Sequence, residues 1–105
     1  DVVYLPTDNT AASNTEAIAN VVLPAGVPVV AGEEGLCKGC GVATLSISYY
    51  DLGVTTGKMA AQILTGEADI STMPIAYAEN FTPKFNTVIG EALGIAMPEG
   101  YTPIE

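Results

Sequence analysis

Two groups of polar residues in this 105-residue chain have side chains that could bind a small ligand. Thr7, Asp8 and Asn9 follow a short apolar run, and Glu33 and Glu34 follow a second one. Their carboxylates could hold an ammonium or hydroxyl group, and the uncharged side chains offer further donors and acceptors. The amides at the start of a following helix could receive an anion such as a carboxylate. The same residue types also cap helices and form turns, so capping is the alternative interpretation of both groups.

The second feature with chemical potential is a Cys-x-x-Cys motif formed by Cys37 and Cys40. A zinc site needs four ligands, and the chain holds no other cysteine and no histidine. A thioredoxin-type redox pair would begin a helix, whereas we expect this pair to lie in a glycine-flanked loop over residues 36–41. The motif therefore predicts a local disulfide or two unpaired thiols, and no metal site.

The composition narrows the classes of function. Twelve acidic residues stand against three lysines or arginines, giving a net charge of −9, which argues against nucleic acid or an anionic membrane as a partner. The sequence lacks phosphate-binding loops, a Gly-x-Ser-x-Gly elbow and metalloprotease signatures. Glu33 and Glu34 would point to opposite sides of an extended backbone, which makes them a poor acid–base pair. The residues therefore give little support to an enzyme, and no cofactor is predicted.

The elements that must position these residues follow from hydrophobic patterning. Continuous apolar runs joined by helical segments are typical of a parallel α/β sheet, and ligands bind such sheets at the carboxyl ends of the strands. Both polar groups stand at those ends. Ser48 and Asn86 are predicted to cap helices, and Gly66 and Gly94 to end them. The predicted elements are strands over 2–5, 27–31 and 42–48, an edge strand over 72–79, helices over 11–25, 49–65 and 87–93, and an extended tail over 98–105.

Four phrases carry a family likeness that composition cannot give. Taken together, they resemble the C-terminal third of type I solute-binding proteins of ABC importers, and most closely the subfamily that includes tryptophan and tyrosine uptake proteins. The likeness covers nearly the whole chain. The phrases are residues 4–9 (YLPTDN), 29–35 (VVAGEEG), 43–53 (ATLSISYYDLG) and 57–66 (GKMAAQILTG).

The resemblance implies an α/β fold, the Rossmann-like clamshell of periplasmic-binding-protein type I, of which this chain supplies part. Residues 1–42 would form a βαβ portion of the second lobe. Residues 43–72 would form a hinge crossover and one helix of the first lobe, and residues 73–105 would return to the second lobe and end in a tail. Both polar groups would line the cleft, and the hinge would contain Thr44, Leu45 and Ser46.

The function implied by the resemblance is capture of a small polar ligand, namely an amino acid and, by subfamily analogy, an aromatic one. The ligand would pass to ABC permease subunits, and the protein would be extracytoplasmic, with any lipid anchor outside this chain. The chain begins without Met on an apolar run, so we expect a C-terminal fragment that holds half a site and is able to self-associate. The alternative is the ligand-sensing core of a transcriptional regulator with the same clamshell. A flavodoxin-like enzyme domain is disfavoured by the missing motifs.

Overall fold

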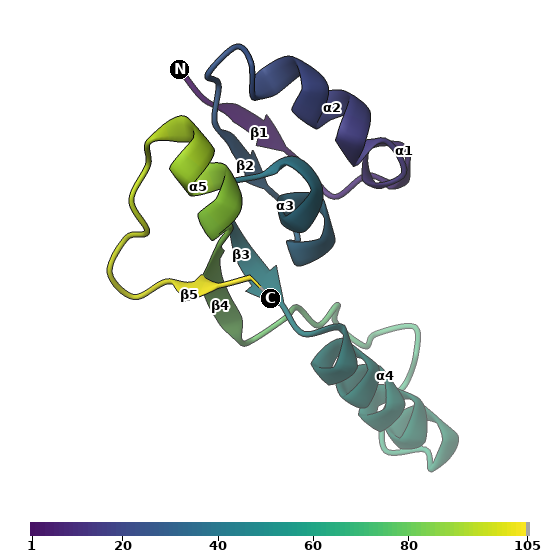
Figure 1. Ribbon diagram of the computed structural model, residues 1–105. Helices are drawn as coiled ribbons and strands as arrows, with labels where there is room; N and C mark the ends of the chain where they lie inside the picture. The colour runs from purple at the N-terminus through teal and green to yellow at the C-terminus, as the bar shows by residue number, and fades with distance from the viewer. Residues whose placement is uncertain (105) are drawn as a thin grey trace. The chain divides into compact units, whose positions relative to one another are not determined.

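The computed structural model describes residues 1–104, which form two compact units (Figure 1). The first unit contains Asp1–Ser46 and the chain from Thr82 onward, and the second contains Ile47–Phe81. The chain therefore leaves the first unit once and re-enters it once.

A five-stranded sheet has its strands in sequence order, β1-β2-β3-β4-β5. The pairs β1–β2, β2–β3 and β4–β5 are parallel, with Val3 opposite Val29 in the first pair. The N–H of Asn86 donates to the carbonyl of Val42 (2.9 Å), so the end of β4 lies beside the start of β3. The predicted parallel α/β class is confirmed. The strands are β1 (Val3–Leu5), β2 (Val29–Ala31), β3 (Ala43–Ile47), β4 (Phe81–Phe85) and β5 (Thr102–Pro103).

The helices of the first unit differ from the prediction in two places. The single helix expected over 11–25 is divided into two, because Ser13 Oγ and Asn14 Nδ2 donate to backbone carbonyls one turn earlier and close the first helix. The loop expected over 36–41 is wrong: a helix occupies most of it. The four helices are α1 (Asn9–Ala12), α2 (Thr15–Val22), α3 (Glu34–Cys40) and α5 (Thr87–Leu93).

The core of the first unit lies between the sheet and its helices. Helix α3 packs on β2, with α1 and α2 against α3 (Figure 1). Ala31 is buried with Leu36 and Cys37 of α3, and a second cluster joins Val42, Phe85 and Ile89. The opposite face of the sheet is exposed to solvent. On this face Tyr4 and Leu45 are 67% and 54% exposed, and Val30 is partly exposed.

The second unit is built on α4 (Tyr49–Leu64), which begins as predicted where Ser48 Oγ accepts from the N–H of Asp51 (3.1 Å). Within the described chain, α4 has no buried residue. The edge strand expected over 72–79 is wrong, because Pro74 has no N–H for a strand ladder and the preceding chain turns around Asp69. No helix within residues 1–104 is long and apolar enough to span a membrane.

Candidate functional site

The loops after β1 and β2 lie against each other at the carboxyl edge of the sheet. The N–H of Gly32 donates to the carbonyl of Leu5 (2.8 Å). A Cβ on Gly32 would lie 2.8 Å from the amide nitrogen of Thr7, so glycine permits this close approach. The structure thus brings the loops that carry the two predicted polar groups together.

Thr7, Asp8 and Asn9 are exposed in the first of these loops. Asp8 is the N-cap of α1, and its Oδ1 accepts from the N–H of Ala11 (2.8 Å). The cap holds the Asp8 side chain at the strand end by a single carboxylate oxygen. Capping and ligand binding, the two interpretations of this group, are therefore compatible at Asp8.

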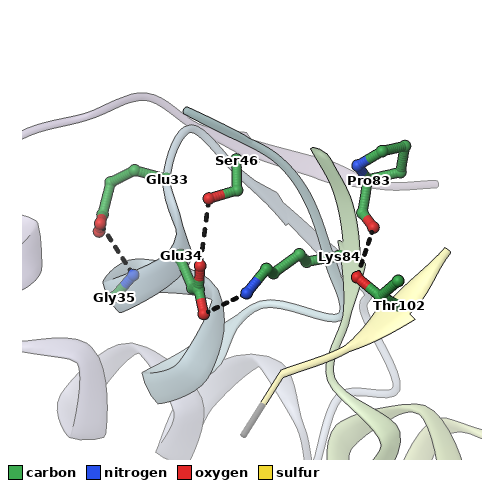
Figure 2. A network of polar contacts seen from close by, with 7 residues as sticks. All are labelled: Glu33, Glu34, Gly35, Ser46, Pro83, Lys84 and Thr102. Atoms are coloured by element: carbon green, nitrogen blue, oxygen red, sulfur yellow. Dashed lines mark hydrogen bonds and ion pairs between the residues drawn. The ribbon is translucent and has the colours of Figure 1, made fainter. Parts of the chain in front are cut away.

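Glu33 holds the start of α3 with both of its carboxylate oxygens. Its Oε2 accepts from the N–H of Gly35 (2.8 Å) (Figure 2). Its Oε1 accepts from the N–H of Leu36. Negative charge at the first turn of a helix is also favoured by the helix dipole. The hydrogen bonds of the Glu33 side chain in this structure are therefore those of a helix cap.

Glu34 bonds to two strands through its two carboxylate oxygens. Lys84 Nζ on β4 lies 2.9 Å from Oε1, and Ser46 Oγ on β3 donates to Oε2 (3.1 Å) (Figure 2). The hydrogen bond from Lys84, assisted by the one from Ser46, holds the pKa of Glu34 below its usual 4.5. Sequence reasoning missed Lys84, because nothing local connects it with a residue 50 positions earlier.

The three predicted hinge residues lie on β3, at the end of the first unit. Thr44 and Ser46 face inward and are buried, whereas Leu45 points outward and is exposed, as strand alternation requires. The Thr44 hydroxyl is buried and has no hydrogen-bond partner within the described chain. Their role as a hinge stays a prediction.

Cys37 and Cys40 are free thiols buried on α3, so the structure shows the second of the two predicted alternatives and no disulfide. Burial, and then the nearby Cys40, raises the pKa of Cys37 to about 12, and burial also raises the pKa of Cys40. Because the thiolate is the reactive form, both side chains act as inert core residues. Within residues 1–104, no group of three His, Cys, Asp or Glu side chains could hold a metal ion.

The second unit carries two hollows that sequence reasoning missed. A small polar one surrounds the start of α4, with Asp51, Tyr77 and Glu79 among its lining residues. A wider apolar groove runs between α4 and the following chain. The groove is lined by Thr56, Met59, Ala60, Ile63, Ile70, Met73, Pro74, Ile75 and Ala76.

In a parallel α/β sheet, ligands bind at the carboxyl ends of the strands, where the two polar loops of this chain meet. Residues 1–102 match the family of ABC transporter substrate binding proteins, and the chain belongs to this family. The predicted family is confirmed. The chain is similar to the tyrosine-binding protein of Clostridioides difficile (strain R20291), with 32% identity over 75 residues, which are 71% of this chain and 21% of that protein.

The solved structures that are similar to the chain include the following three. A ligand-free, open substrate-binding protein with adhesive properties from Clostridium difficile is 33% identical, with a TM-score of 0.72 over 99% of this chain and 36% of that one. A Streptococcus pneumoniae ABC domain in complex with L-Trp is 31% identical, with a TM-score of 0.78 over 94% of this chain and 33% of that one. A conserved domain protein from Vibrio cholerae is 29% identical, with a TM-score of 0.83 over 100% and 36%. The chain thus spans about a fifth of the curated relative and about a third of each solved chain.

Proposed function

We propose that this chain is part of the extracytoplasmic solute-binding component of an ABC importer, which captures a small polar ligand and performs no catalysis. The observation that carries the proposal is the family match over residues 1–102. An amino acid is the proposed ligand class, since the relatives include a tyrosine-binding protein and an L-Trp complex. The same match favours transport over the regulator core with a similar clamshell.

Within this chain, the proposed ligand contacts are Thr7, Asp8 and Asn9. They are exposed at the carboxyl edge, and Asp8 supplies a charge that complements a ligand ammonium. Glu33 and Glu34 line the same edge, but their carboxylate oxygens are already bonded to the start of α3 and to Ser46 and Lys84. Asp8 is therefore the preferred partner for the ammonium.

The exposed apolar surfaces support a two-lobed protein in which this chain supplies half the site. Parallel sheets are normally covered on both faces, yet the face with Tyr4 and Leu45 is exposed. The apolar groove on α4 is a second surface of this kind. We propose that the remaining two thirds of a full-length protein cover them, and that the isolated chain uses them to self-associate.

The proposal is tested by isothermal titration of an amino-acid panel, led by tryptophan and tyrosine, into the full-length protein and into this chain in parallel. We expect saturable binding to the full-length protein and none to the chain, because a clamshell site takes contacts from both lobes. Failure of every amino acid to bind the full-length protein would discard the ligand class and direct the search to sugars and other small solutes.

Changing Asp8 to asparagine in the full-length protein is expected to weaken amino-acid binding by about 1–3 kcal/mol, the usual contribution of a hydrogen bond to a charged group. Asparagine caps helices as well as aspartate does, so α1 should remain intact. Titration measures the affinity, with Glu91→Gln as the control, since it removes the same charge from an exposed position on α5. Unchanged affinity would remove Asp8 from the site.

A further inference from the structure

One carboxylate contacts both strands that connect the first unit with the rest of the chain. Ser46, which donates to Glu34 Oε2, is the last residue of the first unit before the chain leaves it. Lys84, which is paired with Oε1, is the third residue of the returning segment, which begins at Thr82. Figure 2 shows the Glu34 side chain directed toward both partners. Glu34 therefore bonds to both connecting strands, to β3 through Ser46 and to β4 through Lys84.

The returning strand is also held on its other side. Lys84 lies opposite Thr102 of β5, and Thr102 Oγ1 donates to the carbonyl of Pro83 (3.2 Å) (Figure 2). The N–H of Asn86 bonds to the carbonyl of Val42 at the inner end of the β3–β4 pair. The part of β4 inside the first unit is therefore fixed to α3, β3 and β5.

We propose that Glu34 is a positioning residue that clamps β3 to β4 at the boundary of the first unit, so that movement of the second unit occurs outside the clamp, at residues 47–48 and 80–81. The clamp places one hydrogen bond on each carboxylate oxygen of Glu34, which makes Glu34 a weaker candidate than Asp8 for a ligand ammonium. Its use in lobe closure rests on the proposed function, whereas the clamp itself needs no ligand.

The charges and exposure at the clamp suit this role. Lys84 and Glu34 side chains are 26% and 38% exposed, so the pair is partly solvated and its loss should loosen the strands without unfolding the unit. Lys84 and, more weakly, Lys38 favour the charged carboxylate, and the lowered pKa keeps Glu34 ionised at neutral pH. Ser46 needs an acceptor because it is buried, and Glu34 provides it.

Amide hydrogen exchange on this chain without ligand tests the clamp. In Glu34→Ala we expect amide exchange at residues 44–47 and at residues 82, 84 and 85 to become about two- to fivefold faster, the factor that corresponds to the loss of a partly exposed ion pair. Glu34→Gln keeps an acceptor for Ser46 and should give a smaller increase.

Glu91→Gln is the matched control. It should leave exchange in both strands unchanged, because the Glu91 side chain is exposed on α5 and makes no hydrogen bond or ion pair with the described residues. Equal exchange in Glu34→Ala and the original chain would overturn the clamp. Because no ligand is present, failure of the amino-acid titrations would leave this result intact, and failure of the clamp would leave the ligand proposal intact.

Discussion

Replacing Gly90 with alanine should destabilise the first unit by about 1–3 kcal/mol, the usual cost of overpacking a core. A Cβ on Gly90 would lie 2.5 Å from Phe85 Cε1 and 2.9 Å from the carbonyl oxygen of Ile95. The Phe85 ring is only 2% exposed and is packed with Val42 and Ile89, so it has little space to move. The clash must therefore be relieved by shifting α5 away from the sheet.

Two measurements report the loss of stability in Gly90→Ala. Urea unfolding followed by circular dichroism gives the change in free energy. The rate at which iodoacetamide alkylates Cys37 and Cys40 reports opening of the first unit, because both thiols are buried there. A loss of about 1–3 kcal/mol should raise this rate about five- to 150-fold if closing is faster than alkylation.

The control is the same substitution at a helical glycine with free space. A Cβ on Gly57 of α4 would meet nothing within 4 Å, and alanine is a better helix former than glycine. Gly57→Ala should therefore stabilise the second unit by up to about 1 kcal/mol and leave thiol alkylation unchanged. If Gly90→Ala unfolded at the same urea concentration as the original chain, tight packing of α5 on Phe85 would be wrong.

The sequence predicted those elements whose signals are local. Ser48 and Asn86 cap α4 and α5 as expected, because a hydroxyl or amide oxygen reaches the N–H three residues later without tertiary help. Gly94 ends α5 with φ at 69°, the left-handed conformation that glycine adopts readily. The parallel strands were similarly evident from their continuous apolar runs.

The missed elements depend on contacts between distant segments. Helix α3 resembles a loop because it contains Gly35 and Gly39, but a Cβ on Gly39 would lie 2.4 Å from Thr15 Oγ1, so this glycine permits α2 to approach. Strand β4 contains Pro83, which argues against a strand in sequence, yet its carbonyl still accepts from Thr102.

The candidate site was likewise predictable only in part. Its position at the strand ends follows from the α/β pattern, and the two loops do meet there. The bonds made by Glu34 do not follow, because Ser46 and Lys84 are 12 and 50 residues away in the chain. The hydrophobic pattern therefore locates the polar residues at the strand ends, but it does not show which of them form hydrogen bonds within the fold.

Replacing Asn86 with alanine should cost the first unit about 2–4 kcal/mol, because it removes a helix cap and two hydrogen bonds to the carbonyls of α3. The carbonyl of Cys37 keeps the N–H of Gly41 as a donor. Asn86 is 8% exposed and joins two helices. Its Oδ1 accepts from the N–H of Ile89 in α5 (3.1 Å), and its Nδ2 donates to the carbonyls of Cys37 (3.0 Å) and Lys38 (3.2 Å) in α3. Urea unfolding and thiol alkylation measure the loss.

Asn86→Asp separates the two contributions, because aspartate keeps the cap acceptor but has no amide donor and directs a negative charge at the α3 carbonyls. We expect Asn86→Asp to be at least as destabilising as Asn86→Ala. The aspartate retains the helix cap, but the repulsion between its carboxylate and the α3 carbonyls outweighs that gain. Ser48→Ala removes a cap alone and should cost about 1 kcal/mol in the second unit, with no change in thiol alkylation. Near-original stability of Asn86→Asp would show that the cap is the whole contribution, and that the bonds from Asn86 to α3 do not hold α5 in place.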